Sequence, residues 1–168
     1  ETYVKRFLHY QENRIRPIIV IQKLDRDDLF YEDFIKFNPK IVHLPINFSP
    51  VNIFRFYSLL KREKIITVCD FRGDFSGISL FISWMANVKN RIVFYRESVY
   101  QFKANYFKLF YTTIHHRLTL FFSTKILSNS QEAFNNFYKN DSLNKKYHKV
   151  IKNGVYNSNI DLISKEDI

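Results

Sequence analysis

The stretch Ile65–Gly77, IITVCDFRGDFSG, joins an apolar run to a polar segment that contains two glycines. The run Ile65–Val68 is continuously apolar, which is typical of a parallel strand covered on both faces of a sheet. The segment behind it holds two aspartates, one arginine and two of the three glycines of the chain. Such a segment at a strand end favours a binding loop, because loops on a rigid scaffold commonly carry binding residues.

The same alternation of short apolar runs and longer amphipathic stretches extends along the whole chain. It predicts strands at residues 18–22, 41–45, 65–70, 91–97, 125–130 and 148–155. Helices are predicted at residues 1–13, 29–37, 47–64, 77–89, 101–124 and 131–139. Ser49 and Ser130 are the expected N-caps of two helices, and Pro50 suits the first helical position. Strands that alternate with helices predict an α/β fold, a Rossmann-like parallel sheet with helices on both faces.

The chain carries a formal net charge of +10 over 168 residues. Residues 1–84 hold 13 basic and 10 acidic residues, whereas residues 85–168 hold 13 and 6. Such an excess favours an anionic partner: nucleic acid, phospholipid headgroups or a phosphorylated substrate. A genome rich in Lys, Asn, Ile and Phe codons is the alternative explanation. The single cysteine excludes a disulfide framework and a structural zinc site. No apolar run approaches the roughly 18 residues that span a bilayer.

Polar residues follow most of the predicted strands, and in parallel α/β sheets ligands bind at the carboxyl ends of the strands. The candidate binding residues are Asn47, Ser49, Cys69, Asp70, Arg72, Asp74, Arg96 and Glu97, with Ser130, Asn153 and Gly154 behind the last two strands. Asp70 and Asp74 could hydrogen-bond hydroxyl groups or accept a proton, and Asp70 is the candidate catalytic residue. Arg72 and Arg96 could hold a phosphate in a bidentate fork. The structural alternative is that Asp70 caps the following segment and pairs with Arg72.

Missing motifs narrow the chemistry. Neither G-x-G-x-x-G nor G-x-x-x-x-G-K-[ST] is present, so dinucleotide binding and Walker-type phosphate binding are not indicated. No G-x-S-x-G marks a hydrolase nucleophile. His115 and His116 point to different helix faces, so we expect solvent-facing or partly packed histidines rather than metal ligands. Cys69 is either an inert core thiol or a ligand-facing residue. Gly73 and Gly77 allow backbone turns that other residues resist.

The ordered segments IVHLPINFSP, IITVCDFRGD, RIVFYRES, KILSNSQEAF and HKVIKNGV resemble the N-terminal half of family 4 glycosyltransferases, which are retaining enzymes with the GT-B fold. Glu1 is similar to the glutamate of the family's Gly-Gly-x-Glu loop, whose glycines and preceding strand would lie before this sequence. Asp70 keeps the family's His-Asp pattern, whereas Cys69 stands in place of the histidine. Ser130 and the Asn153–Gly154 pair resemble family residues near the interdomain cleft.

The resemblance implies a GT-B N-terminal domain at residues 1–155 that lacks its first strand, and a linker at residues 156–168. The C-terminal nucleotide-sugar domain would lie outside this sequence, so we expect residues 1–168 alone not to transfer sugar. The implied enzyme moves a hexose-like sugar from a nucleotide-sugar donor to a glycan or lipid-linked acceptor in surface polysaccharide synthesis. Residues between Asn47 and Glu97 would bind the acceptor, without a cofactor or a metal. The implied location is the bacterial cytoplasm, at the inner face of the plasma membrane.

The segment 101–125 interleaves basic and aromatic residues, which suits a membrane interface and also nucleic-acid stacking. We expect it to help dock the protein on anionic lipid, the alternative being a helix with one packed face and one solvated face. A nucleic-acid-binding domain is an alternative function, but no known motif supports it and we expect no nucleic-acid partner. A non-catalytic α/β interaction domain is the other alternative, because Cys69 replaces the family histidine.

Overall fold

The computed structural model describes residues 4, 7–9, 11, 14–22, 39–95, 106–137 and 148–152. The chain divides into two compact units, Glu1–Lys64 and Ile65–Ile168. The predicted helix at residues 29–37 lies outside the described residues, as does most of the predicted helix at 1–13. The predicted domain boundary at residue 155 also lies outside them and stays a prediction.

The first unit contains a pair of parallel strands and one helix. Strand β1 (Ile18–Ile21) pairs with β2 (Lys40–His43), with Ile18 opposite Lys40. Helix α3 (Pro50–Arg62) begins with proline at its first position, as predicted, because proline lacks the N–H that would be unpaired there. It buries one apolar stripe, formed by Phe56, Leu59 and Leu60.

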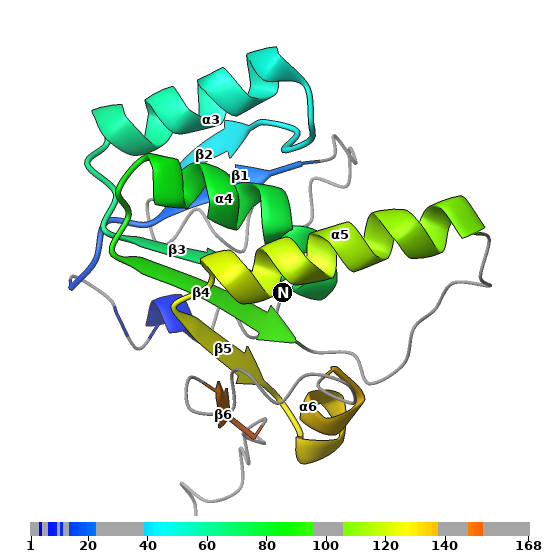
Figure 1. Cartoon of the computed structure of the whole chain (residues 1–168). Coiled ribbons are helices and arrows are strands. Elements are labelled where there is room, and N and C mark those ends of the chain that lie inside the picture. Colours follow the sequence, from blue (N-terminus) through cyan, green and yellow to red (C-terminus); the bar gives the residue numbers. More distant parts are fainter. Residues whose placement is uncertain are drawn as a thin grey trace, which may run out of the picture. The chain divides into compact units, whose positions relative to one another are not determined.

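The second unit contains a parallel sheet in the order β3-β4-β5-β6. Its elements in chain order are β3 (Thr67–Asp70), the 3₁₀ turn η1 (Gly73–Ser76), α4 (Gly77–Met85), β4 (Asn90–Tyr95), α5 (Tyr106–Phe122), β5 (Lys125–Ser128), α6 (Gln131–Phe137) and β6 (His148–Val150). Within this unit each strand pairs with the next one along the chain, and α4 and α5 lie side by side (Figure 1). These carboxyl strand ends share one edge, so the loops behind them are brought together.

The core of the second unit joins the sheet to α4 and α5. Val93 and Ile126 from the strands pack with Leu80 of α4 and with Leu120 and Phe122 of α5. These residues remove apolar surface of both the strands and the helices from water. Burial of apolar surface is the main favourable term in folding.

The predicted fold class is confirmed: the chain forms a Rossmann-like α/β arrangement of parallel strands flanked by helices. One detail is wrong. The run from Ile65 was expected to be covered on both faces, but Ile66, Thr67 and Cys69 are exposed. Within the described residues β3 pairs with β4 alone, so β3 has the position of an edge strand there rather than of a central one.

Candidate functional site at the carboxyl ends of the strands

Asp70, the last residue of β3, is the centre of a hydrogen-bonded cluster with Arg72 and Ser79. The backbone N–H of Arg72 donates to Oδ1 of Asp70 at 2.9 Å, and Nε and Nη2 of Arg72 donate to Oδ1 and Oδ2 at 3.0 and 2.6 Å. Ser79, near the start of α4, donates its hydroxyl to Oδ2. The pairing of Asp70 with Arg72 is therefore confirmed, and both oxygens of Asp70 are engaged by the protein.

The environment of Asp70 keeps its carboxyl charged. Burial acts to raise its pKa, but the hydrogen bonds and charge of Arg72, together with the hydrogen bond from Ser79, outweigh burial and hold the pKa below its ordinary value. Arg72 contacts both carboxylate oxygens through its Nε and Nη2 groups, and its predicted role in phosphate binding stays a prediction. The pair thus fixes the loop that carries the next aspartate.

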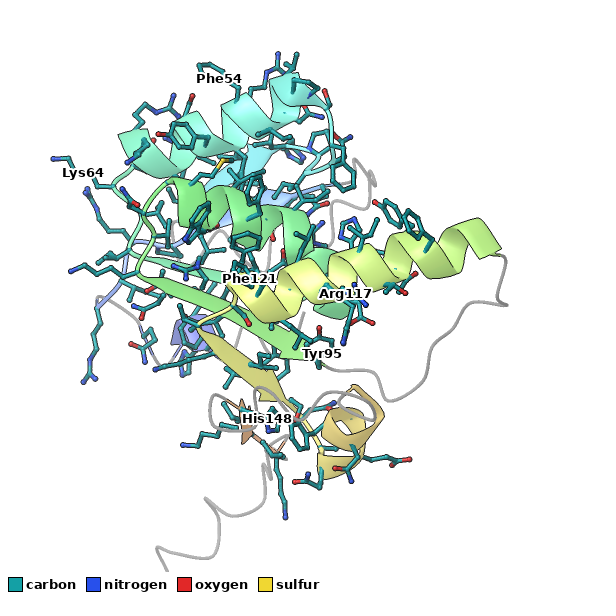
Figure 2. The ribbon with its side chains drawn as sticks, in the orientation of Figure 1. Phe54, Lys64, Tyr95, Arg117, Phe121 and His148 are labelled. Carbon is teal, nitrogen blue, oxygen red and sulfur yellow. The ribbon has the colours of Figure 1, made fainter. Side chains whose placement is uncertain are left out.

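Asp74, in η1, faces β4 and α5. The hydroxyl of Tyr95, labelled in Figure 2, donates to Oδ1 of Asp74 at 3.2 Å, and Nδ1 of His116 lies 2.9 Å from the same oxygen. A carboxylate only accepts hydrogen bonds, so Nδ1 of His116 carries the proton. The hydroxyl of Thr119 donates to the backbone carbonyl of Asp74 at 3.1 Å. Within the described part of the chain no hydrogen bond reaches Oδ2 of Asp74, so this oxygen can accept one from a bound hydroxyl.

His115 and His116 are adjacent but have different environments. His115 is fully buried, and its ring lies 4.4 Å from the ring of Tyr111 and 5.9 Å from that of Phe75. Burial lowers the pKa of His115, and the nearby charge of Arg72 lowers it further. The expectation of solvent-facing or partly packed histidines is therefore wrong for His115, because two aromatic rings cover it.

Four residues of this cluster were not among the predicted site residues: Ser79, Tyr95, His116 and Thr119. Two signals could have pointed to them. Tyr95 ends a strand that the register places beside β3, with Asp70 opposite Val93. His116 and Thr119 are three residues apart, so they share one face of α5.

The two glycines of the loop serve different purposes. Gly73 has φ +60°, in the left-handed region that favours glycine, so the predicted turn is confirmed there. Gly77 has φ −52°, an ordinary helical value, so the predicted turn is wrong at this position. A Cβ on Gly77 would lie 2.7 Å from the carbonyl oxygen of His115 and 2.8 Å from Cβ of Leu118. Gly77 therefore permits the close approach of α4 to α5.

Cys69 is a free cysteine with exposed surface at the edge of the sheet. Desolvation by the protein around its sulfur raises the pKa of the thiol to about 12, and the charge of Asp70 acts in the same direction. The thiol is therefore protonated at neutral pH and a poor nucleophile, because the thiolate is the reactive form. Of the inert core thiol considered for Cys69, the inertness is supported by the raised pKa, whereas the core position is wrong because the residue as a whole is exposed.

In the first unit, Asn47 organises the turn between β2 and α3. Its Oδ1 accepts the backbone N–H of Ser49 at 3.0 Å and the Nδ2 group of Asn52 at 3.0 Å. Ser49 stands at the N-cap position, but its side chain makes no capping hydrogen bond. The capping role predicted for the Ser49 hydroxyl is therefore wrong, since the Asn47 side chain closes this turn.

Ser130 follows β5 and caps α6, as predicted. Its hydroxyl accepts the backbone N–H of Ala133 at 3.0 Å. The neighbouring Ser128 donates its hydroxyl to the Ser130 carbonyl at 2.9 Å and lies 3.0 Å from Nε2 of His148. The remaining predicted site residues lie outside the described residues: Glu1, Arg96, Glu97, Asn153 and Gly154.

Two further properties of the described residues bear on chemistry and location. No group of three or more His, Cys, Asp or Glu side chains among them could hold a metal ion. In the same parts of the chain, every helix is too short or too polar to cross a membrane.

The described elements together define a Rossmann-like α/β domain with a polar carboxyl edge. A solved structure with this fold is Anabaena Alr3699/HepE, crystallised in complex with UDP, to which the chain is similar with a TM-score of 0.67 and 12% sequence identity. The match covers 90% of this chain and 40% of that chain. At this identity the similarity establishes the fold alone. No family model and no curated protein matches the sequence.

Proposed function

We propose that this chain is the acceptor-side, N-terminal domain of a retaining GT-B glycosyltransferase of family 4. The whole enzyme transfers a hexose-like sugar from a nucleotide-sugar donor to a glycan or lipid-linked acceptor in surface polysaccharide synthesis. The observation that carries the proposal is the fold similarity, over 90% of the chain, to a protein solved with UDP. The ordered segments that resemble family 4 support the same class of reaction.

The acceptor is proposed to contact Asp74 at the carboxyl ends of β3 and β4. Tyr95 and His116 hold Oδ1 of Asp74, which leaves Oδ2 to accept a hydrogen bond from a sugar hydroxyl. Asp70 and Arg72 are positioning residues in this proposal, because they bind each other and fix the loop. Most contacts to the nucleotide belong to a second domain, as in the resembling family.

The proposed place of action is the cytoplasm, at the inner face of the plasma membrane. The support is the charge distribution, since residues 85–168 hold 13 basic and 6 acidic residues and anionic headgroups attract such a surface.

The test compares the native gene product that contains this chain with residues 1–168 alone. Both are incubated with radiolabelled UDP-sugars and a membrane extract, and sugar incorporation is measured. We expect incorporation by the native product and none by residues 1–168. In the native product, Asp74→Asn should lower transfer at least about tenfold, as expected for a lost hydrogen bond to a charged group, and leave UDP binding unchanged.

The matched control is Glu63→Gln, which neutralises a partly exposed carboxylate at the end of α3 and should leave transfer unchanged. Turnover by residues 1–168 alone would contradict the assignment of this chain as an acceptor-side half. A native product that neither binds UDP nor transfers sugar would favour the non-catalytic interaction domain.

A further inference from the structure

Helix α5 carries an exposed stripe made of Phe110, Ile114, Arg117 and Phe121. Phe110 is 65% exposed and Phe121 80%, which are high values for phenylalanine. The intervals of four, three and four residues put all four side chains on one face of the helix. At a rise of about 1.5 Å per residue the stripe is about 16 Å long. Arg117 and Phe121 are labelled on α5 in Figure 2.

The opposite face of α5 is firmly packed, so the exposed stripe is not the result of a loosely placed helix. His115, Thr119 and Phe122 on that face are buried, and Gly77 allows α4 to approach closely. The stripe therefore cannot turn inward without breaking these contacts.

The C-terminal end of the stripe is linked to Trp84 of α4 through the buried ring of Phe122. The ring of Phe122 lies 4.9 Å from that of Phe121 and 5.2 Å from that of Trp84, the single tryptophan of the chain. Trp84 is itself exposed. Exposed phenylalanines beside an arginine, as in the stripe, are typical of peripheral helices at a membrane interface.

The segment that carries the stripe contains basic residues and no acidic ones. Between Glu97 and Glu132 the sequence contains no aspartate or glutamate. Arg117 lies within the stripe, and Lys125 follows shortly after its end and is exposed. An aromatic stripe that carries Arg117, in a segment without acidic residues of its own, complements an apolar layer beneath anionic headgroups; a nearby acid is Asp74 of η1, which His116 contacts.

We propose that the stripe Phe110–Ile114–Arg117–Phe121 docks this protein on an anionic lipid bilayer, with α5 lying in the plane of the interface. The phenylalanines and Ile114 enter the headgroup region, and the guanidinium of Arg117 stays at the level of the phosphates. This inference does not depend on the proposed reaction, because it rests on α5 and not on Asp74.

Two other occupants fit the stripe less well. A second copy of the chain also carries a net charge of +10, and the stripe offers no carboxylate to pair with the Arg117 of a partner copy. A nucleic acid would require several cations at phosphate spacing, whereas three of the four stripe residues are apolar.

The test is flotation of the 168-residue chain with vesicles of phosphatidylcholine, alone or mixed with phosphatidylglycerol. We expect the chain to float with the anionic vesicles and remain at the bottom with the neutral ones. The double variant Phe110→Ser/Phe121→Ser should bind about 100-fold more weakly, since each buried phenylalanine contributes about tenfold. Arg117→Gln should bind about fivefold more weakly.

The matched control is Phe54→Ser, which removes an equally exposed phenylalanine from α3 in the first unit (69% exposed). It should float like the wild type. Equal flotation with neutral and anionic vesicles, or equal losses from Phe54→Ser and the double variant, would overturn the proposal. A dimer in light scattering that Phe121→Ser dissociates, with no flotation of the wild type, would assign the stripe to a second copy. UDP binding by the native product is unaffected by these outcomes, so this inference and the proposed function can fail separately.

Discussion

Two ion pairs in this protein have the same nitrogen–oxygen distance, 2.6 Å, in very different surroundings. Lys40 and Glu63 join the start of β2 to the end of α3 on the surface of the first unit. Asp70 and Arg72 join the end of β3 to its following loop in the second unit, where Asp70 is buried. The equal distances show that geometry alone does not distinguish a surface contact from a structural anchor.

The two pairs differ in how much stabilisation each carboxylate would lose if its cationic partner were removed. Water can replace Lys40 at Glu63, so this exposed pair adds little to stability. Asp70 has almost no access to water, and it accepts hydrogen bonds from Arg72 and Ser79 as well as carrying the charge of the pair. Breaking a buried pair leaves an uncompensated charge behind, which is strongly destabilising.

The largest effect is expected for Asp70→Asn. The change removes the negative charge that faces Arg72 and should lower the free energy of unfolding of the second unit by about 3 kcal/mol. Urea unfolding monitored by Trp84 fluorescence measures it, because Trp84 lies in this unit. A loss below about 1 kcal/mol would mean that the Asp70–Arg72 pair behaves as a surface pair.

The same pair should also make the wild type sensitive to acid. The pKa of Asp70 is lower in the folded protein than in the unfolded chain. At a pH between these two pKa values the folded state therefore binds fewer protons than the unfolded chain. The stability that the charged Asp70 contributes is fully present above the unfolded pKa of about 4 and is lost as the pH falls through the folded pKa. Below about pH 4 the stability of Asp70→Asn should therefore fall less steeply than that of the wild type. Parallel curves would show that Asp70 does not contribute to the acid sensitivity.

An intermediate effect is expected for Gly77→Ala, which tests the packing behind the buried pair. The new methyl group would meet the carbonyl oxygen of His115 at 2.7 Å, so α4 and α5 must move apart. Overpacking lowers the free energy of unfolding by about 1–3 kcal/mol, whereas the higher helix propensity of alanine raises it by up to about 1 kcal/mol. We expect a net loss of about 1–2 kcal/mol by the same Trp84 measurement. An unchanged or higher stability would show that α4 and α5 can move apart at little cost in free energy.

The comparison also shows which features could be predicted from the sequence. Asp70 and Arg72 are two residues apart, so their pairing could be foreseen from local turn chemistry. The partners of Asp74 could not, because Tyr95 and His116 are separated from it by 21 and 42 residues and meet it only through the sheet register and the packing of α5. The parallel α/β fold followed from the alternation of elements, whereas the helical backbone of Gly77 and the role of Asn47 depended on contacts that periodicity does not encode.

The smallest effect is expected for Glu63→Gln, the surface counterpart of Asp70→Asn. Hydrogen bonds from Lys40 and Arg62 lower the pKa of Glu63, but the group is solvated and its pairs are screened by salt. Far-UV circular dichroism of urea unfolding should therefore give the same midpoint as the wild type at moderate salt. A midpoint shift as large as that of Asp70→Asn would show that the distance of 2.6 Å, and not burial, sets the strength of these pairs. A small shift that disappears with added salt would fit a screened surface pair, and the contrast between the two carboxylates would stand.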